Sequence, residues 1–508
     1  MKKLRLISLL LVTVMCLGSL VSCLGLTGQN PGGNEGGDRT DGSWDGVDFK
    51  GQKVNFCISV NKYVECSFPE ASVYTKGPDT AGSNEVAKEV LARNKAAAET
   101  LNVEIVYSTK DLTYDLIHED VRTIVQTSSK TSPDIYNNDT YGLSRAMVDG
   151  LLWNVKNPGE GVKTYFDFNA KGWYTEFMKG CTFDQSKMYL FAGDYFIDMI
   201  RMAWVVLVNN EILSNNVKKM PVWCGSTDEF YSYVADGFWD LDILGDMSSR
   251  VFVEGSGGVS GETEKEDALV GFAMNHTTDW IISASSAVTL YYQDKENNYQ
   301  PMVMETIDEY QKVSNKYTSM AEAVGVYWEQ EVKTSTDCFL QGNFLFAMSR
   351  LGEMESPELR DFSASKGLVP VPKWEQDSQE DYHTVVHDQA EIGCILNTAK
   401  AYSAASALMQ YLNEESGNVV YAYYEKGLKY KYNSDKNSRI MMDIVRDSTD
   451  TPFGWQIGVL CQQLYTGSGS LHGMYIEENK TCASTFASEK DAYRDCMNKM
   501  IAKFAELK

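Results

Sequence analysis

Apolar and polar residues follow two different periods in the part of the chain that precedes residue 140. Three short segments, 53–60 (KVNFCISV), 103–107 (VEIVY) and 133–139 (PDIYNND), have the alternation or the short apolar run of a β-strand. Two longer segments between them, 83–101 and 114–128, keep their apolar residues on one helical face. Strands and helices that alternate at these lengths predict a parallel α/β sheet.

The third predicted strand ends in polar residues. Asn138 and Asp139 close it, and Tyr141 follows. Open parallel sheets bind their ligands beyond the carboxyl ends of their strands. Asn138, Asp139 and Tyr141 are therefore predicted ligand contacts.

The N-terminus has the pattern of an export signal. Lys2, Lys3 and Arg5 precede an apolar segment, which is short for a membrane span of about 18 to 20 residues. Residues 20–23 (LVSC) resemble a bacterial lipobox. The resemblance implies that residues 1–22 are a signal peptide and that a lipidated Cys23 anchors the protein to the outer face of the bacterial cell membrane. The alternative is an uncleaved N-terminal helix.

Residues 23–46 are rich in Gly, Asn and Asp and have little apolar content. Such a segment buries too little apolar surface to offset the entropy of ordering it. We predict a flexible tether between the lipid anchor and the folded body.

Composition restricts the ligand. The chain after the predicted tether, about 460 residues, is long enough for two or three domains. The formal charge of −24 disfavours nucleic acid as a partner and favours a neutral or cationic ligand. The 29 Tyr and 10 Trp suit sugars, whose C–H faces stack on aromatic rings.

The cysteines beyond Cys23 are scattered and form no C-x-x-C pair, which gives little support to a zinc site or a dense disulfide framework. Most are expected to be small buried hydrophobic residues. One or two disulfides remain possible, and Cys57 with Cys66 is one candidate pair.

A metal site is not predicted. His383 and His387 would share a helical face, but the intervening 384–386 (TVV) favours a strand, in which residues four apart lie about 13 Å from each other. Asp240 and Asp242 have the spacing of a calcium loop without its glycine and final glutamate. Asp240 is instead predicted to cap a helix.

Catalytic motifs are also missing, since the chain has neither G-x-S-x-G nor H-E-x-x-H. The 70 acidic residues could include a glycosidase pair by chance, but no local motif identifies one. We therefore predict a protein that is not an enzyme and needs no cofactor, with a glycan-processing enzyme as an alternative.

Several segments, in order and spacing, resemble family 1 extracellular solute-binding proteins, the receptor subunits of ATP-driven sugar importers, and most closely those of clostridia-type bacteria. The segments are VLARNKAAAETLNVEIVY, SPDIYNNDTYGLSRAMVDGLLWNV, KMYLFAGDYFIDMIRMAWVVLVNNEIL, DGFWDLDIL, LVGFAMNHTTDW, FLQGNFLFAMS, GLVPVPKWEQDSQEDYHTVVHDQ and AYYEKGLKYKYNSDKNSRIMMDIVRDS.

The resemblance implies a type II periplasmic-binding-protein-like α/β fold, with two lobes joined by a hinge and the ligand cleft between them. We place lobe one at residues 47–200 plus 388–427, and lobe two at 201–387 plus 428–508. Binding would proceed by hinge closure around the ligand.

The same resemblance adds candidate ligand residues. Trp280 and Trp455 match positions where related sugar receptors carry an aromatic platform. Tyr195 lies at the predicted lobe crossing, and Arg350 follows an apolar strand. Asp194 and Asp388 could accept hydrogen bonds from hydroxyls.

The function implied is the capture of a carbohydrate, an oligosaccharide above all, and its delivery to ABC transporter permease subunits by a monomeric receptor. Two other functions remain open. One is a glycan-adhesion protein without a permease. The other is the same receptor fold with a polyamine or peptide as its ligand.

Overall fold

The structure is a computed structural model. It describes residues 39, 42–59, 72–77, 85–255, 268–328, 334–431, 436–454, 460–461 and 482–507.

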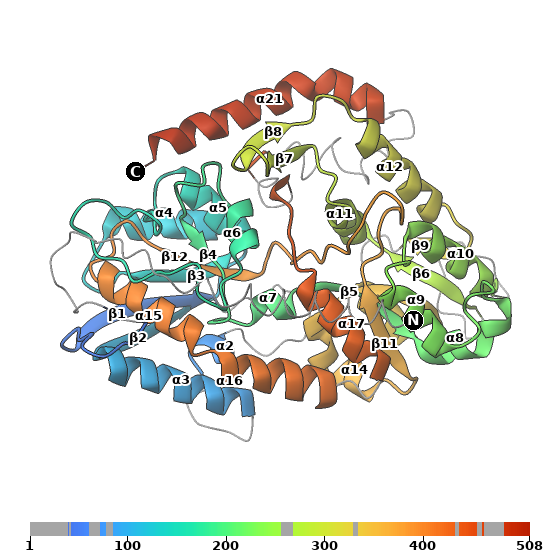
Figure 1. The fold of residues 1–508 in the computed structure, drawn as a ribbon, viewed down its shortest axis with the longest axis horizontal. Coiled ribbons are helices and arrows are strands. Elements are labelled where there is room, and N and C mark those ends of the chain that lie inside the picture. The colour runs from blue at the N-terminus through green and yellow to red at the C-terminus, as the bar shows by residue number, and fades with distance from the viewer. Residues whose placement is uncertain are drawn as a thin grey trace, which may run out of the picture.

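Two separate β-sheets organise the chain, and Figure 1 shows them side by side. The first has the strand order β2-β1-β3-β12-β4. Its strands are β1 (Gln52–Ser59), β2 (Val103–Lys110), β3 (Ile135–Asp139), β4 (Leu190–Phe191) and β12 (Glu391–Ile395). β1 pairs in parallel with β2 and β3, which confirms the predicted parallel unit, whereas β12 runs antiparallel to β3 and β4.

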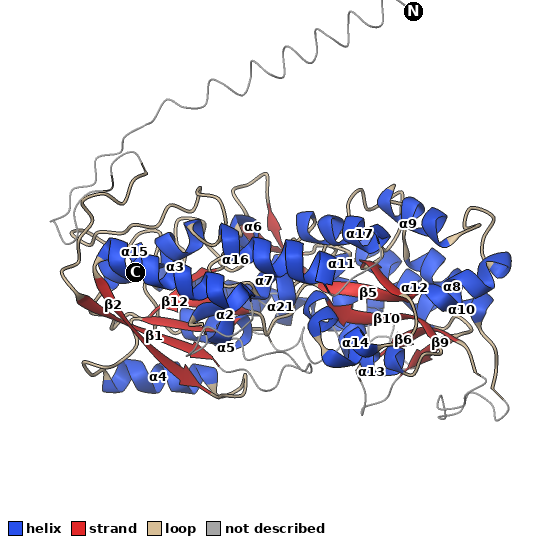
Figure 2. Cartoon of the chain, turned by 90° about the horizontal axis from the view of Figure 1, so that it is seen from below, coloured by secondary structure: helices blue, strands red, loops and turns tan. Residues whose placement is uncertain are grey.

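Helices cover both faces of the first sheet. Figure 2 shows α3 and α15 on one side and α4 on the other. These helices are α3 (Glu85–Leu101), α4 (Ile117–Thr127), α5 (Thr140–Val148) and α15 (Tyr402–Glu414). The apolar face of α3 is buried as its period predicts, through Val86, Val90, Ala97 and Leu101.

The second sheet has the strand order β11-β5-β10-β6-β9. Its strands are β5 (Trp204–Asn209), β6 (Val270–Met274), β9 (Val326–Trp328), β10 (Phe344–Arg350) and β11 (Lys366–Pro370). β5, with every residue buried, runs antiparallel to β10 and β11.

The helices around the second sheet lie between its strands or follow them along the chain. They are α8 (Asn210–Asn216), the 3₁₀ helix η1 (Val217–Lys219), α9 (Thr227–Ala235), α10 (Leu241–Val251), α11 (His276–Ser285), α12 (Asp308–Ala321), α13 (Ser335–Leu340), the 3₁₀ helix η2 (Leu351–Glu355), α14 (Pro357–Asp361) and α17 (Lys436–Asp447). The predicted cap of α10 is confirmed, because the Asp240 carboxylate accepts a hydrogen bond from the Ile243 N–H at 2.9 Å.

We call the elements around the first sheet lobe one and those around the second sheet lobe two. The residue limits predicted for the lobes stay a prediction. Further elements lie beside the sheets or run between them: α2 (Ser72–Thr75), α6 (Thr175–Gly180), α7 (Asp198–Arg201), the hairpin β7 (Tyr291–Asp294) and β8 (Gln300–Val303), α16 (Gly417–Val420), the π-helix η3 (Tyr421–Lys431) and α21 (Cys482–Glu506).

The C-terminal helix α21 contacts both lobes, along one edge of the molecule in Figure 1. Tyr493 packs against Tyr291 of the β7–β8 hairpin, with ring centroids 6.2 Å apart. Near its other end, Phe504 packs against Phe183 of lobe one, and Lys187 donates a hydrogen bond to the Phe504 carbonyl at 2.9 Å.

The last part of the predicted tether is docked on lobe one. Arg39 forms a two-point ion pair with Glu414 at 2.9 and 2.8 Å, and its guanidinium lies 4.2 Å from the Trp44 ring centroid. Trp44 is the apolar residue that makes this docking favourable. Cys23, the signal segment and most of the tether lie outside the described residues.

Most cysteines in the described part of the chain are buried thiols, as predicted: Cys57, Cys181, Cys224, Cys338, Cys394 and Cys482. Because Cys57 is free, the pairing with Cys66 is wrong. The structure instead joins Cys461 to Cys496 of α21 in a disulfide. Within the described ranges, every helix is too short or too polar to span a bilayer.

Candidate functional site

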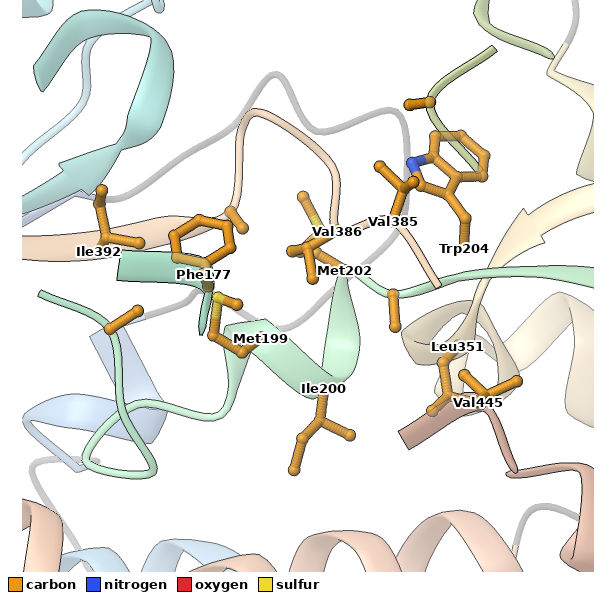
Figure 3. Packing of buried hydrophobic residues seen from close by; sticks show 14 of the residues in the cluster. Phe177, Met199, Ile200, Met202, Trp204, Leu351, Val385, Val386, Ile392 and Val445 are labelled. Atoms are coloured by element: carbon orange, nitrogen blue, oxygen red, sulfur yellow. The ribbon is translucent and has the colours of Figure 1, made fainter. Parts of the chain in front are cut away.

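Two chain segments pair where the lobes meet, as Figure 3 shows from close by. One leaves α7 and enters β5, and the other, 384–387, returns toward lobe one. Ala203 and Val386 form an antiparallel bridge. The Trp204 N–H donates to the Val385 carbonyl at 3.0 Å. The segment is extended, which confirms the predicted crossing strand and rules out a helical histidine pair.

An aromatic ring, that of Trp204, lies on this crossing and contacts an arginine and a histidine. Trp204 opens β5 and stands opposite Arg350, the last residue of β10. The Arg350 guanidinium lies 5.5 Å from the Trp204 ring centroid, and the His387 ring stacks on the indole at 5.5 Å with an interplanar angle of 20°. The ring is 5% exposed, and its buried Nε1–H has no hydrogen-bond partner among the described residues.

Sequence reasoning identified Arg350 but missed Trp204. The available signal was a tryptophan at the start of an otherwise aliphatic strand, in AWVVLVNN. A fully buried strand does not need a side chain with a polar tip there.

Two acidic residues, Asp388 and Asp139, lie close to each other near His387. The His387 Nδ1 is 2.8 Å from the Asp388 carboxylate. Asp139, at the carboxyl end of β3, caps α5 by accepting a hydrogen bond from the Gly142 N–H at 2.8 Å. Burial raises the pKa of Asp139 to about 8, and the nearby charge of Asp388 adds to the rise. The structure thus brings Asp139 and Asp388, two candidate ligand contacts, close together from positions far apart in the chain.

Asn138 and Tyr141 lie next to Asp139 and have different environments. The Asn138 side chain accepts a hydrogen bond from the Asp139 N–H at 2.8 Å, and its buried Nδ2 has no partner among the described residues. Tyr141 is half-buried and accepts a hydrogen bond from Arg145 at 2.8 Å. Tyr141 also packs edge-on against the exposed ring of Tyr114.

Two predicted residues have their polar groups engaged within the protein. Tyr195 is 1% exposed and donates to the Asn137 side chain at 3.0 Å, so it lies in the core. Asp194 accepts a hydrogen bond from the Tyr174 hydroxyl at 3.2 Å. Burial raises the pKa of Asp194, which Arg446 of α17 lowers in part. Trp280 is half-buried in α11, and Trp455 lies outside the described residues.

A pocket of about 720 Å³ opens next to the crossing. Glu176 of α6 lines it from lobe one, whereas most of its wall belongs to lobe two. His383, on the same extended segment as His387, lies in this wall, 3.6 Å from the carboxylate of Asp450. The hydrogen bond from His383 is the main cause that lowers the pKa of Asp450.

The pocket lining is strongly acidic. Its cationic side chains are Lys295 and Lys373, and burial lowers the pKa of Lys373. Its carboxylates are Glu176, Asp236, Glu380, Asp381, Asp447 and Asp450. Over the described part of the chain, His, Cys, Asp and Glu side chains do not gather in groups of three that could hold a metal ion.

A buried ionic cluster lies at the hinge. Arg201 of α7 is 1% exposed and pairs with Asp198 and with Glu355 of lobe two, each at 3.0 Å. Tyr74 and Tyr423 both donate hydrogen bonds to Glu355, at 2.9 and 3.3 Å. The cluster therefore joins α2, α7, η2 and the π-helix η3.

Glu391 of β12, which follows the returning segment 384–387 in the chain, also belongs to the cluster. The Glu391 N–H donates to Asp198 at 3.0 Å, and the Glu391 carboxyl accepts from Asn137 at 2.9 Å. Burial, followed by the charge of Asp198, raises the pKa of Glu391 well above its usual range.

A second contact between the lobes comes from the β7–β8 hairpin. The Gln293 amide donates to the carbonyls of Lys179 and Thr182 in lobe one, both at 2.9 Å. Lys179 also donates to the Tyr299 hydroxyl at 3.2 Å. Together with α21, the hairpin holds the lobes together at a distance from α7, as the arrangement in Figure 1 shows.

No protein-family model matches the sequence, and a comparison with curated proteins found no match. Solved structures do match. The GacH receptor of Streptomyces glaucescens GLA.O, solved unliganded and with acarbose, has a TM-score of 0.52 and 12% identity, over 88% of this chain and 99% of the receptor. The cyclic α-maltosyl-1,6-maltose binding protein of Arthrobacter globiformis has a TM-score of 0.54 and 11% identity, with the same coverage of 88% and 99%.

A third match is the galacto-N-biose/lacto-N-biose I-binding protein of the ABC transporter from Bifidobacterium longum. Its TM-score is 0.50 at 13% identity, over 89% of this chain and 98% of that protein. At these identities the matches show the fold. The predicted class, a type II periplasmic-binding-protein-like α/β fold, is confirmed, and the matched structures are binding proteins.

Proposed function

We propose that this chain is the extracytoplasmic substrate-binding lipoprotein of an ATP-driven importer, which captures an oligosaccharide by hinge closure and delivers it to the permease. The observation that carries the proposal is the Trp204 indole. It contacts Arg350 and His387 where the two lobes meet, and its Nε1–H has no acceptor among the described residues. A buried donor without a partner costs free energy that a ligand hydroxyl would recover.

The groups around Trp204 suit a sugar. The Asp388 carboxylate and the carboxyl group of Asp139, whose pKa burial raises to about 8, can both accept hydrogen bonds from hydroxyls. Arg350 donates a hydrogen bond to Glu353 at 3.0 Å, which holds its positive charge in a fixed position. A hydrogen-bond donor and several acceptors in one place suit the hydroxyls of a pyranose.

The two lobes give the mechanism. A ligand that contacts Asp139 in lobe one and Trp204 in lobe two favours the closed state by its differential affinity. Bending would occur at 200–203 and 384–391, around the buried ionic cluster of Arg201.

We further propose Tyr141, Trp280 and Trp455 as outer ligand contacts, and lipidated Cys23 as the membrane anchor of a monomeric protein. The chain is proposed to catalyse no reaction.

One observation favours a second ligand class. The pocket beside the crossing has six carboxylates and two lysines in its lining. A polyamine would be attracted by this excess of negative charge. The two ligand classes differ in salt dependence, because salt screens the attraction between a polycation and the carboxylates and has little effect on a neutral saccharide.

A ligand screen by thermal unfolding of the full-length protein tests the proposal. The panel contains monosaccharides, linear oligosaccharides, spermidine and short peptides. A true ligand at 100 times its dissociation constant stabilises the protein by about 2.7 kcal/mol. Stabilisation by an oligosaccharide, lost in Trp204→Leu and kept in the control Tyr430→Ala, supports the proposal. Stabilisation by spermidine alone would replace the carbohydrate with a polyamine.

A further inference from the structure

Lobe two carries an exposed aromatic patch, which we define as Val222, Trp223, Tyr233 and Phe238. Trp223 and Tyr233 stack in parallel, with ring centroids 3.8 Å apart and an interplanar angle of 9°. Phe238 extends the patch, 5.1 Å from the Tyr233 ring. Phe238 is 37% exposed and Val222 is fully exposed. Large apolar side chains that gather on a surface mark binding sites more often than singly exposed ones do.

The patch adjoins the pocket along the chain. Ala235, Asp236 and Gly237 line the pocket, and in the chain they connect Tyr233 to Phe238. Gly237 has a φ of +87°, a conformation that favours glycine and lets the chain turn sharply there. One short turn therefore contributes to the pocket lining and has an aromatic residue at each of its two ends.

This turn is held rigidly. Tyr382, which lines the pocket, donates to the Val234 carbonyl at 2.7 Å and accepts from the Trp239 N–H at 3.2 Å. Trp239 is fully buried and donates to the Pro370 carbonyl at 3.0 Å. Both ends of the turn are thus bonded to lobe two, so the rings keep a fixed position relative to the pocket.

The chemistry of the patch favours a sugar over a protein. Three partly exposed rings, each of which offers about 150–250 Å² when fully buried, fall short of the roughly 800 Å² per partner of a stable protein interface. A pyranose ring is matched in size to one aromatic face. The Asp236 carboxylate at the rim can accept hydrogen bonds from its hydroxyls.

We infer that the aromatic patch is an outer carbohydrate subsite, on which the sugar rings of a long oligosaccharide stack after they leave the pocket. The inference rests on the proposed function and adds to it a preference for ligand length. Short saccharides would be bound by the groups around Trp204 alone, and only longer ones would reach Phe238 and Trp223.

A calorimetric titration of the full-length protein with a ladder of linear gluco-, galacto- and manno-oligosaccharides, from disaccharide to heptasaccharide, tests the inference. The variants are Phe238→Leu, which keeps an apolar side chain without a ring face, Phe238→Tyr, which keeps the ring, and Tyr430→Ala, an exposed tyrosine outside the patch. We expect Phe238→Leu to lose roughly tenfold in affinity for the longest ligands and nothing for the shortest. Phe238→Tyr and Tyr430→Ala should match the wild type at every length.

The outcomes separate the two proposals. If Phe238→Leu and the wild type bind every length equally, the outer subsite is wrong while saccharide capture stands. A loss that is equal at every length would also overturn the subsite, because it would indicate a general disturbance of lobe two. If the wild type binds no saccharide of any length, both proposals fail.

Discussion

Arg201 and Glu355 form a buried ion pair at 3.0 Å that links α7 to η2 of lobe two. Their side chains are 2% and 5% exposed, so water cannot replace either partner. Asp198, Tyr74 and Tyr423 complete the bonding of the pair. The hinge region is therefore held by directional polar contacts as well as by packing.

Removing the arginine should destabilise the protein strongly. Breaking a buried pair leaves an uncompensated charge, and we expect Arg201→Met to lower the free energy of unfolding by about 3–5 kcal/mol. The control is Lys53→Ala, which removes an ion pair with Glu104 whose side chains are 65% and 55% exposed. That variant should change stability by less than about 1 kcal/mol. Urea unfolding measures the free energy of unfolding of both variants. Equal losses in Arg201→Met and Lys53→Ala would contradict the stabilising role of the cluster.

Asp139 makes stability depend on pH. Its pKa is raised from 3.8 to about 8 in the folded state, so the folded state binds this proton more tightly than the unfolded state does. The stabilisation of the folded state that comes from this tighter proton binding is fully present below pH 4. It is lost as pH rises to about 8. Asp139→Asn keeps an oxygen to cap α5 and removes the titration.

The stability of Asp139→Asn relative to wild type should thus increase between pH 4 and pH 8, by on the order of a few kcal/mol. Urea unfolding at a series of pH values measures the difference. Asp236→Asn, which alters an exposed carboxylate, is the control. A difference that stays constant with pH, or that has the opposite slope, would show that Asp139 is ionised in the folded protein.

Gln293 should restrain opening of the lobes. Its two hydrogen bonds to Lys179 and Thr182 connect the β7–β8 hairpin to lobe one. Gln293→Ala removes both hydrogen bonds, and each such bond stabilises by about 0.5–1.5 kcal/mol. The population of the closed arrangement relative to the open one should therefore fall roughly tenfold or more. We expect a larger radius of gyration in solution scattering. Asn297→Ala, which removes a bond within the hairpin to Gln300, should leave the radius unchanged. Identical profiles for the two variants would refute the restraint.

The disulfide between Cys461 and Cys496 should stabilise the region around α21. The two cysteines are 35 residues apart, and a loop of this length corresponds to about 3–4 kcal/mol in the chain-entropy model. A reducing agent should lower the melting temperature of the wild type and leave that of Cys496→Ser unchanged. Cys224→Ala, which alters a buried free thiol, should respond to the reducing agent as the wild type does. An equal response in Cys496→Ser would contradict this contribution.

Local patterns predicted the first lobe well. The alternation in 53–60 and 103–107 and the helical face of α3 depend on neighbours in sequence, and the structure confirms each. The Asp240 cap is also a local interaction, between residues three apart. The fold class required the order of many segments, because no single motif identifies it.

The site depends on contacts that local patterns do not contain. β12 pairs with β3 across more than 250 residues, and this pairing brings Asp388 to Asp139. Tyr195 was predicted at the crossing from its sequence position, but its side chain points into lobe one. Trp204 was missed because an aromatic residue in an apolar strand is expected in the core. That its Nε1–H has no acceptor among the described residues becomes known only from the three-dimensional structure.

The most direct test of the central claim is a calorimetric titration of an oligosaccharide into the wild type and into Trp204→Leu, side by side. If two lobes close on a carbohydrate over Trp204, the wild type will show saturable binding to one site, and the variant, still folded, will bind at least tenfold more weakly. Equal affinities in the two proteins, or no heat of binding in the wild type with any saccharide tested, would contradict the claim.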